Sequence, residues 1–318
     1  MVLPEYPRVI HLSGGIALID TCHHGHPGTI GVYAVTLPEG GWALVETGPG
    51  VSYPELMHGF AQAGLAMAEL RAVLLTHIHL DHAGGAGRII NETNATLYVH
   101  PVGARHMADP SRLLASAKRI YEDQMDALWG PMEPVPAERI VTPKPDSEFT
   151  VGGLTIRAVD TPGHASHHFA YLLPDGSLFT GDAAGILLPG STLIRPAVPP
   201  PEIHIEQWEA TLTKMANLQP SRLLLTHYGE VTTPAEHLAL VPERHRAWAN
   251  ELLTGLHAGE DRAELIARME ALQDREFAEY NVPHGIRQQY RVTSNAEMTA
   301  DGLARYWRKH RPERVNSE

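Results

Sequence analysis

The chain has 318 residues, a formal net charge of −12, one cysteine and 20 histidines. At roughly 100–200 residues per domain, this length favours one large domain or a domain with an appendage. An acidic chain repels phosphate backbones, which disfavours a general nucleic-acid binder. The single Cys22 excludes an internal disulfide framework and a multi-cysteine zinc knuckle. No apolar run approaches the ~18 residues of a membrane span, and the first residues lack a signal-peptide pattern, so we predict a soluble cytoplasmic protein.

Short runs rich in Val, Ile, Leu and Thr end at Gly, Pro or Asp up to about residue 227, which is typical of strands and turns. The predicted strands are Val9–Leu12, Ile16–Asp20, Gly31–Leu37, Trp42–Glu46, Ala72–Thr76, Thr96–Val99, Leu154–Asp160, Phe169–Leu173, Ser177–Thr180 and Arg222–Thr226. The predicted helices between them are Ser52–Ala63, His82–Asn91, Ser111–Leu128 and Ile205–Asn217. Strands interspersed with helices predict an α/β fold.

The last quarter of the chain has a different pattern. From Pro234 onward the apolar residues recur at helical spacing and glycine becomes rare. The run Ser294-Asn-Ala-Glu297 fits a capping box and predicts that the last long helix opens at Ser294. The proline-rich segment Pro131–Pro145 has apolar neighbours and is expected to pack against the protein. We therefore predict a domain over residues 1–232 and a C-terminal helical domain over residues 233–318.

Polar residues follow five of the predicted strands, at the point where each strand ends. Ligands collect at the carboxyl ends of strands in an open sheet flanked by helices, so these residues can converge on one pocket if their strands are neighbours. The five segments are Glu46-Thr-Gly, His77-Ile-His79-Leu-Asp81-His82, Thr161-Pro-Gly-His164, Gly181-Asp182 and His227-Tyr-Gly.

The second segment places three histidines and an aspartate within six residues. Neutral imidazole and carboxylate ligands suit Zn, Fe, Ni and Cu, and no thiolate is needed. His77 and His79 alternate along an extended segment and so point the same way. The alternative is a solvated surface loop, which the four other strand-end segments make less attractive.

These five segments, in this order, resemble the motif set of the metallo-β-lactamase-fold hydrolases over about residues 8–230. The resemblance implies a four-layer αββα sandwich with a C-terminal helical extension. It also implies two divalent metal ions, with zinc favoured and iron or manganese as alternatives. By analogy with the family, His77, His79 and His164 hold the first ion. Asp81, His82 and His227 hold the second, and Asp182 bridges the two.

The first motif departs from the family, which usually carries aspartate where this chain has Glu46. The resemblance implies that Glu46 orients a ligand histidine or the ligand loop without binding metal itself. The alternative is a carboxylate that only caps a turn.

The expected chemistry is attack by a hydroxide formed from a water that the two metal ions share. Asp81 is the first choice to accept and pass on the proton, and Asp182 is the second. The Tyr228 phenol is a candidate donor to the developing oxyanion, although it could equally pack under the site.

Glyoxalase II-type thioesterases, lactonases and a ribonuclease branch share the aspartate-bridged pattern that this chain resembles. True β-lactamases usually lack that aspartate and are exported, so a β-lactam substrate is disfavoured. We expect a thioester, lactone or carboxylic ester, and we keep a phosphodiesterase or endoribonuclease and a mononuclear iron persulfide dioxygenase as alternatives. From another class, the chain could be an inactive relative that binds a partner through its C-terminal helices.

Residues outside the motifs are candidates for contact with a small-molecule substrate. His23 and His24 lie in a segment where relatives carry a loop over the cleft, although the sequence favours a solvated histidine-rich turn. Tyr121 and Trp129 belong to an amphipathic stretch that would offer an apolar wall if it caps the site. A basic cluster ends the chain, as the helix dipole favours, and a homodimer through the C-terminal helices is a further hypothesis.

Overall fold

The computed structural model describes residues 6–315, and these divide into two compact units. The first unit holds residues 6–160 and 167–181, and the second holds residues 161–166 and 182–315. The predicted domain boundary between residues 232 and 233 is a different division of the chain and stays a prediction.

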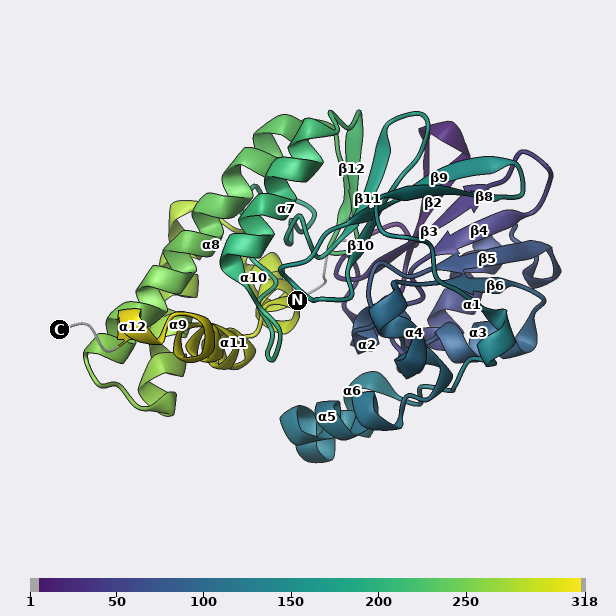
Figure 1. The fold of residues 1–318 in the computed structure, drawn as a ribbon. Coiled ribbons are helices and arrows are strands. Elements are labelled where there is room, and N and C mark those ends of the chain that lie inside the picture. The colour runs from purple at the N-terminus through teal and green to yellow at the C-terminus, as the bar shows by residue number, and fades with distance from the viewer. Residues whose placement is uncertain (1–5, 316–318) are drawn as a thin grey trace. The chain divides into compact units, whose positions relative to one another are not determined.

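A seven-stranded mixed sheet forms the centre of the first unit (Figure 1). Antiparallel pairing runs from β1 to β4 and parallel pairing from β4 to β7. Because β4 and β5 are parallel neighbours, the residues that follow them emerge at the same edge of the sheet. The bounds are β1 Val9–Leu12, β2 Ile16–Asp20, β3 Gly31–Thr36, β4 Trp42–Val45, β5 Leu70–Leu74, β6 Thr96–Tyr98 and β7 Ile140–Val141.

A second sheet packs face to face against the first within this unit. Its strands here are antiparallel, in the order β11-β10-β9-β8. Tyr33 of the first sheet meets Phe179 of the second edge-on at 5.2 Å, and the Tyr171 hydroxyl donates to the Leu75 carbonyl at 2.9 Å. The bounds are β8 Ser147–Val151, β9 Leu154–Asp160, β10 Phe169–Leu172 and β11 Ser177–Gly181.

Helices cover the other face of the first sheet. Leu56 and Phe60 of α1 and Ile90 of α3 belong to the same buried cluster as sheet residues such as Leu44 and Val73. Strands buried on both faces read as continuous apolar runs, which is why the sequence signal was strong there. The helices of this unit are α1 Tyr53–Gln62, α2 Leu80–Ala83, α3 Ala86–Glu92, α4 Pro101–Ala108, α5 Ser111–Tyr121 and α6 Met125–Trp129.

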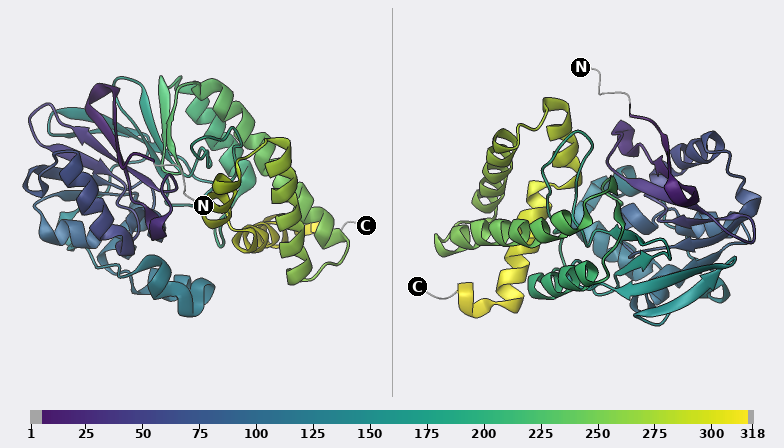
Figure 2. Two further views of the ribbon diagram at one scale, coloured as in Figure 1. Left: turned by 180° about the vertical axis from the view of Figure 1, so that it is seen from behind. Right: turned by 90° about the horizontal axis from the view of Figure 1, so that it is seen from above.

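The second unit is mainly helical (Figures 1 and 2). The side chains of Trp248, Phe277 and Tyr290 are fully buried in it. Among residues 6–315, no helix is long and apolar enough to cross a membrane. The elements of the second unit are α7 Ile205–Asn217, β12 Arg222–Leu225, β13 Gly229–Val231, α8 Pro234–His257, α9 Arg262–Glu279, α10 His284–Thr293, α11 Ala296–His310 and α12 Pro312–Val315.

Three of the predicted helices differ in detail. The predicted helix His82–Asn91 is two helices, α2 and α3, because Gly84 and Gly85 press against the backbone of Pro49 and Thr47, where a Cβ would not fit. The predicted helix Ser111–Leu128 is interrupted after Tyr121, since Glu122 adopts a φ of 47°. The predicted capping box at Ser294 is wrong by one residue. The Asn295 side chain caps α11 by accepting from two backbone amides at 2.8 and 3.2 Å.

Candidate metal centre

Glu46 is the organising carboxylate of the first unit. It follows β4, is completely buried, and reaches the segment that follows β5, which leaves the sheet at the same edge. Its Oε1 accepts from His82 Nδ1 at 3.1 Å and also from the Thr76 hydroxyl. Its Oε2 accepts from the Thr76 backbone amide at 3.3 Å. Glu46 therefore orients a histidine of the second motif, as the sequence interpretation proposed.

The same contacts determine the protonation of two imidazoles. Because the Thr76 hydroxyl proton goes to Glu46, Thr76 Oγ1 is left to accept from Nδ1–H of His77, 3.0 Å away. His82 donates its own Nδ1–H to Glu46. Both rings consequently present Nε2 with its lone pair, which is the state that binds a metal ion.

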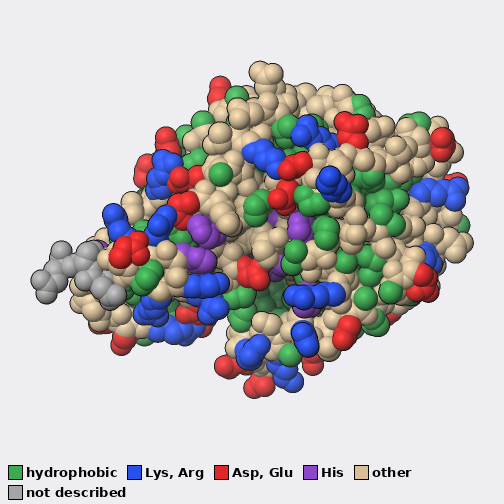
Figure 3. Space-filling model, viewed as in Figure 1, with side chains coloured by type: hydrophobic (Ala, Val, Ile, Leu, Met, Phe, Trp, Pro, Cys, Tyr) green, Lys and Arg blue, Asp and Glu red, His purple; other side chains and the backbone are tan. Residues whose placement is uncertain are grey.

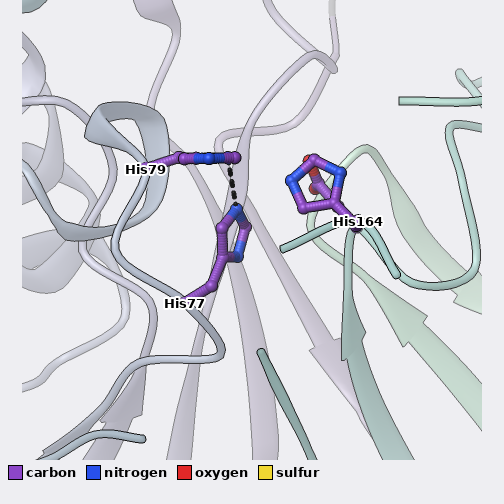
Figure 4. Close-up of side chains that lie close together, drawn as sticks. His77, His79 and His164 are labelled. Atoms are coloured by element: carbon purple, nitrogen blue, oxygen red, sulfur yellow. Dashed lines mark hydrogen bonds and ion pairs between the residues drawn. The ribbon is translucent and has the colours of Figure 1, made fainter. Parts of the chain in front are cut away.

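The remaining ligand atoms of the first unit lie close to these nitrogens. His77 Nε2 is 2.9 Å from His79 Nδ1, and Figure 4 shows the two rings with this contact dashed. His82 Nε2 is 3.5 Å from Asp81 Oδ2. His77 and His82 are completely buried, whereas 22% of the Asp81 side chain is exposed. Asp81 is therefore the acidic group of this set that solvent or a substrate reaches most easily.

Asp182 is the central carboxylate of the second unit. Its Oδ2 lies 3.3 Å from His164 Nε2, and its Oδ1 lies 3.4 Å from His227 Nε2. All three side chains are almost fully buried. One carboxylate thus turns one oxygen to each of two imidazoles, which is the arrangement that a ligand shared by two metal ions requires.

His164 is held in place by its backbone surroundings. Its Nδ1–H donates to the Ala197 carbonyl at 2.8 Å, which leaves Nε2 for the Asp182 side. The preceding Gly163 has a φ of 134°, and a Cβ there would lie 2.4 Å from Trp208 Cα. Only glycine combines this backbone conformation with so close an approach, which explains why the third motif has glycine before its histidine.

The spacing of these atoms fits metal ligands better than hydrogen bonds. The imidazole–carboxylate separations of 3.3, 3.4 and 3.5 Å exceed the usual 2.7–3.2 Å of an N–H···O bond. Two ligand atoms at ~2.0–2.1 Å from one tetrahedral ion are separated by about 3.3 Å. The residues present therefore fit divalent metal ions.

The predicted substrate residues lie together. His23 stacks on Trp129 at 5.6 Å, and Tyr121 meets Trp129 edge-on at 5.1 Å. Burial raises the pKa of Tyr121, and the charge of Asp81 adds to the shift. His24 is exposed, its ring meets that of His23 edge-on at 4.2 Å, and its Nε2 lies 3.2 Å from the Leu128 carbonyl oxygen. The structure thus connects all four predicted residues in one aromatic cluster.

Some residues of the site were not predicted to have their role. The Thr76 hydroxyl forms hydrogen bonds with both Glu46 and His77, and only its position before the histidine motif could have indicated this. His168 is completely buried with its ring 4.9 Å from that of His77. A Cβ at Gly181 would lie 2.4 Å from Thr76 Oγ1 and 2.7 Å from His168 Nε2. Tyr228 is buried, and its predicted catalytic role stays a prediction.

Each unit thus supplies a set of imidazole and carboxylate ligands of the kind found in metal-binding α/β sandwiches. The model of the metallo-beta-lactamase superfamily matches residues 26–227, more than half of the chain. The chain belongs to this superfamily.

Relatives and solved structures agree with this assignment. The metallo-beta-lactamase fold-containing protein ST1585 of Sulfurisphaera tokodaii is 27% identical over 197 residues, which are 60% of this chain and 74% of that protein. An atrochrysone carboxyl ACP thioesterase of Aspergillus fumigatus is 27% identical over 177 residues, which are 55% of this chain but only 32% of that protein. The structure of the metallo-beta-lactamase family protein TTHA1429 from Thermus thermophilus superimposes with a TM-score of 0.64 at 22% identity, covering 88% of this chain and 89% of that one. The predicted fold class, an αββα sandwich with a C-terminal helical extension, is confirmed.

Proposed function

We propose that this protein is a binuclear metal-dependent hydrolase that cleaves an ester-like bond. The observation that carries the proposal is the Asp182 carboxylate, with one oxygen facing His164 and the other facing His227. A carboxylate that faces two buried imidazoles in this way suits a pair of cations about 3.5–4 Å apart.

The ligands of the two units are proposed to act on the same two ions. His77, His79 and His164 would hold one, Asp81, His82 and His227 the other, and Asp182 would bridge. The support is that each unit presents its own imidazole and carboxylate atoms close together, and that the chain belongs to the metallo-beta-lactamase superfamily. Zinc is the proposed metal because every ligand is nitrogen or oxygen and several are histidines.

Two bound divalent ions supply an activated water at neutral pH and polarise the carbonyl that it attacks. The protein's own residues then determine how protons move. Asp81 is the more exposed carboxylate beside the ligand histidines and is proposed to take the proton of the attacking water and return it to the leaving group. Glu46 keeps the Nε2 lone pairs of His77 and His82 available by accepting, directly or through Thr76, the proton on the other nitrogen.

An ester-like substrate is proposed over a nucleic acid for two reasons. One relative is described as an acyl-carrier-protein thioesterase, and a water activated by metal ions is a nucleophile able to cleave a thioester. Some basic side chains of the C-terminal helices are neutralised by carboxylates, since Arg262 pairs with Asp301 at 2.7 Å and Arg311 pairs with Glu206. On the face shown in Figure 3, acidic and basic side chains are interspersed and do not form a basic track.

Metal analysis of the purified protein tests the binuclear site. We expect two equivalents of zinc in the wild type and the loss of at least one in His79→Ala. His58→Ala is the matched control, because His58 lies on α1 of the same unit with 71% of its side chain exposed. One equivalent of iron would indicate the persulfide dioxygenase instead. Unchanged metal content and rate in His79→Ala would contradict the ligand assignment.

Substrate assays then separate carbonyl from phosphoryl chemistry. We expect turnover of acyl thioesters, lactones or p-nitrophenyl esters that is abolished by chelation and restored by added zinc. Asp81→Asn should lower kcat more than it lowers metal content. Turnover of bis-(p-nitrophenyl) phosphate with no turnover of any ester would replace the proposal by the phosphodiesterase.

A further inference from the structure

The segment Asp182–Val198, which we call the ligand loop, contacts all three proposed ligands of the second unit. It begins with Asp182 itself. The Leu187 amide donates to the His227 carbonyl at 2.7 Å, and the Ala197 carbonyl accepts from His164 Nδ1 at 2.8 Å. The loop closes on itself, because Ile186 and Arg195 exchange backbone hydrogen bonds of 2.8 and 2.9 Å. A shift of this loop would therefore move three ligands together.

The C-terminal helices hold the ligand loop at several points along its length. His237 of α8 donates from Nε2 to the Ala184 carbonyl at 2.8 Å, two residues after Asp182. The Tyr290 hydroxyl of α10 donates to the Leu193 carbonyl at 2.5 Å and accepts from the Leu188 amide at 3.2 Å. At the far end, a Cβ on Gly302 of α11 would lie 2.1 Å from the Val198 carbonyl oxygen, so that helix touches the loop backbone directly.

Arg195 anchors the loop inside the helical core. Its side chain is fully buried, and its guanidinium lies over the ring of Trp248 of α8 at 4.4 Å. Its Nε is 3.9 Å from Glu276 Oε2 of α9, an ion pair without a hydrogen bond among the described residues. Burial lowers the pKa of Arg195 to about 10, so it stays charged at neutral pH. Burying a charge costs desolvation energy unless nearby groups interact with it favourably. For Arg195 these groups are the Trp248 ring of α8 and the Glu276 carboxylate of α9.

We propose that helices α8–α11 are the positioning scaffold of the metal centre, which they hold through the ligand loop. Tyr290 and His237 are positioning residues, because they act on Asp182, His164 and His227 only through the backbone of the loop. The inference rests on the proposed metal centre. It assigns a structural role to the C-terminal helices, which contain none of the five motifs.

Tyr290→Phe is the direct test, because it removes one hydroxyl and keeps the ring. Tyr306→Phe is the matched control. Tyr306 is also buried on α11 of the same unit, and its hydroxyl bonds with Glu206 at the start of α7 and not with the ligand loop. Metal affinity is measured by competition with a chromophoric chelator, ligand geometry by the visible spectrum of the cobalt-loaded protein, and stability by thermal melting of the metal-free protein.

We expect Tyr290→Phe to bind its ions about 10-fold more weakly than the wild type, within the range for partners that orient ligands, and to shift the cobalt bands. Tyr306→Phe should melt at a similarly lowered temperature with unchanged affinity and spectrum. Equal affinities in the two variants would overturn the inference while leaving the proposed function intact. A wild-type protein that binds no metal would overturn both.

His237 provides a second pair of variants in case Tyr290→Phe does not fold. His237→Leu removes the N–H that reaches the Ala184 carbonyl, whereas His237→Gln can still present one. We expect weaker metal binding in His237→Leu and recovery in His237→Gln. Equal affinities in both, at equal melting temperatures, would contradict the positioning role.

Discussion

Replacing Glu46 by glutamine is the sharpest perturbation of the first unit, because it changes one oxygen to an amide without changing shape. In the wild type, Glu46 accepts from His82 Nδ1, from the Thr76 amide and from the Thr76 hydroxyl. An amide has one acceptor oxygen where the carboxylate has two, and its NH2 faces groups that themselves donate. The tautomers of His82 and His77 are then no longer fixed.

The size of the effect follows from these contacts. A hydrogen bond to a charged group contributes about 1.5–3 kcal/mol, which corresponds to a loss of roughly 10- to 100-fold in affinity. The ion proposed to bind His82 should be lost first, so we expect about one equivalent of metal in Glu46→Gln and two in the wild type.

Chelator competition and elemental analysis measure this, with Glu39→Gln as control because Glu39 is exposed on a turn of the same unit. A folded Glu46→Gln protein whose affinity for both ions lies within twofold of that control would refute the reasoning.

Four further substitutions test the fold and the site. Burial raises the pKa of Asp20 to about 6, so the folded protein binds the Asp20 proton more tightly than the unfolded chain does. Relative to Asp20→Asn, the wild-type free energy of unfolding should therefore fall by up to about 3 kcal/mol as pH rises from about 4 to about 6, as measured by urea denaturation. Phe179→Ala, between the two sheets, should cost about 3–5 kcal/mol in the same assay, and a cost under 1 kcal/mol would contradict the packing. Gly163→Ala should lower the melting temperature and metal content together, unlike Gly64→Ala, which has a positive φ but open space around it. Trp129→Ala should raise KM for acyl substrates more than it lowers kcat, with recovery in Trp129→Phe; an unchanged KM would remove the aromatic cluster from the substrate site.

Strand positions were predictable where a run rich in Val, Ile and Leu ends at a turn residue. The predicted strands Val9–Leu12, Ile16–Asp20 and Leu154–Asp160 match the structure at both ends, and the others differ by one or two residues. The strands β7, β8 and β13 were missed. The burial pattern of β8 shows why, since Glu148 and Thr150 are exposed and only Val151 is fully buried, which leaves little apolar signal.

Helices with polar sequences were harder to predict. The helix α10 was missed, because His284–Thr293 is mostly polar and only a few of its side chains, such as Ile286 and Tyr290, are buried. The start of α11 was placed at Ser294, because Ser-x-x-Glu is a capping pattern. The Asn295 side chain is the N-cap because it accepts from two backbone amides, whereas the Ser294 hydroxyl points to the Pro196 carbonyl. Which of two adjacent capping residues begins the helix depends on the path of the preceding chain, which the sequence alone does not show.

The proposed ligands could be named from the sequence because metal binding demands particular atoms, and strand ends supply them at fixed places in the sequence. The residues that position the ligands were not, because they contribute what almost any residue has. His227 is held by the amide of Leu187, and His164 is held by the carbonyl of Ala197, and neither side chain carries any signal of that role. These backbone contacts depend on the course of the ligand loop, which Tyr290 of α10, a helix not predicted from the sequence, contacts at two points. The sequence therefore contains no sign of this support for the three proposed ligands, and Tyr290→Phe measures how much the support contributes.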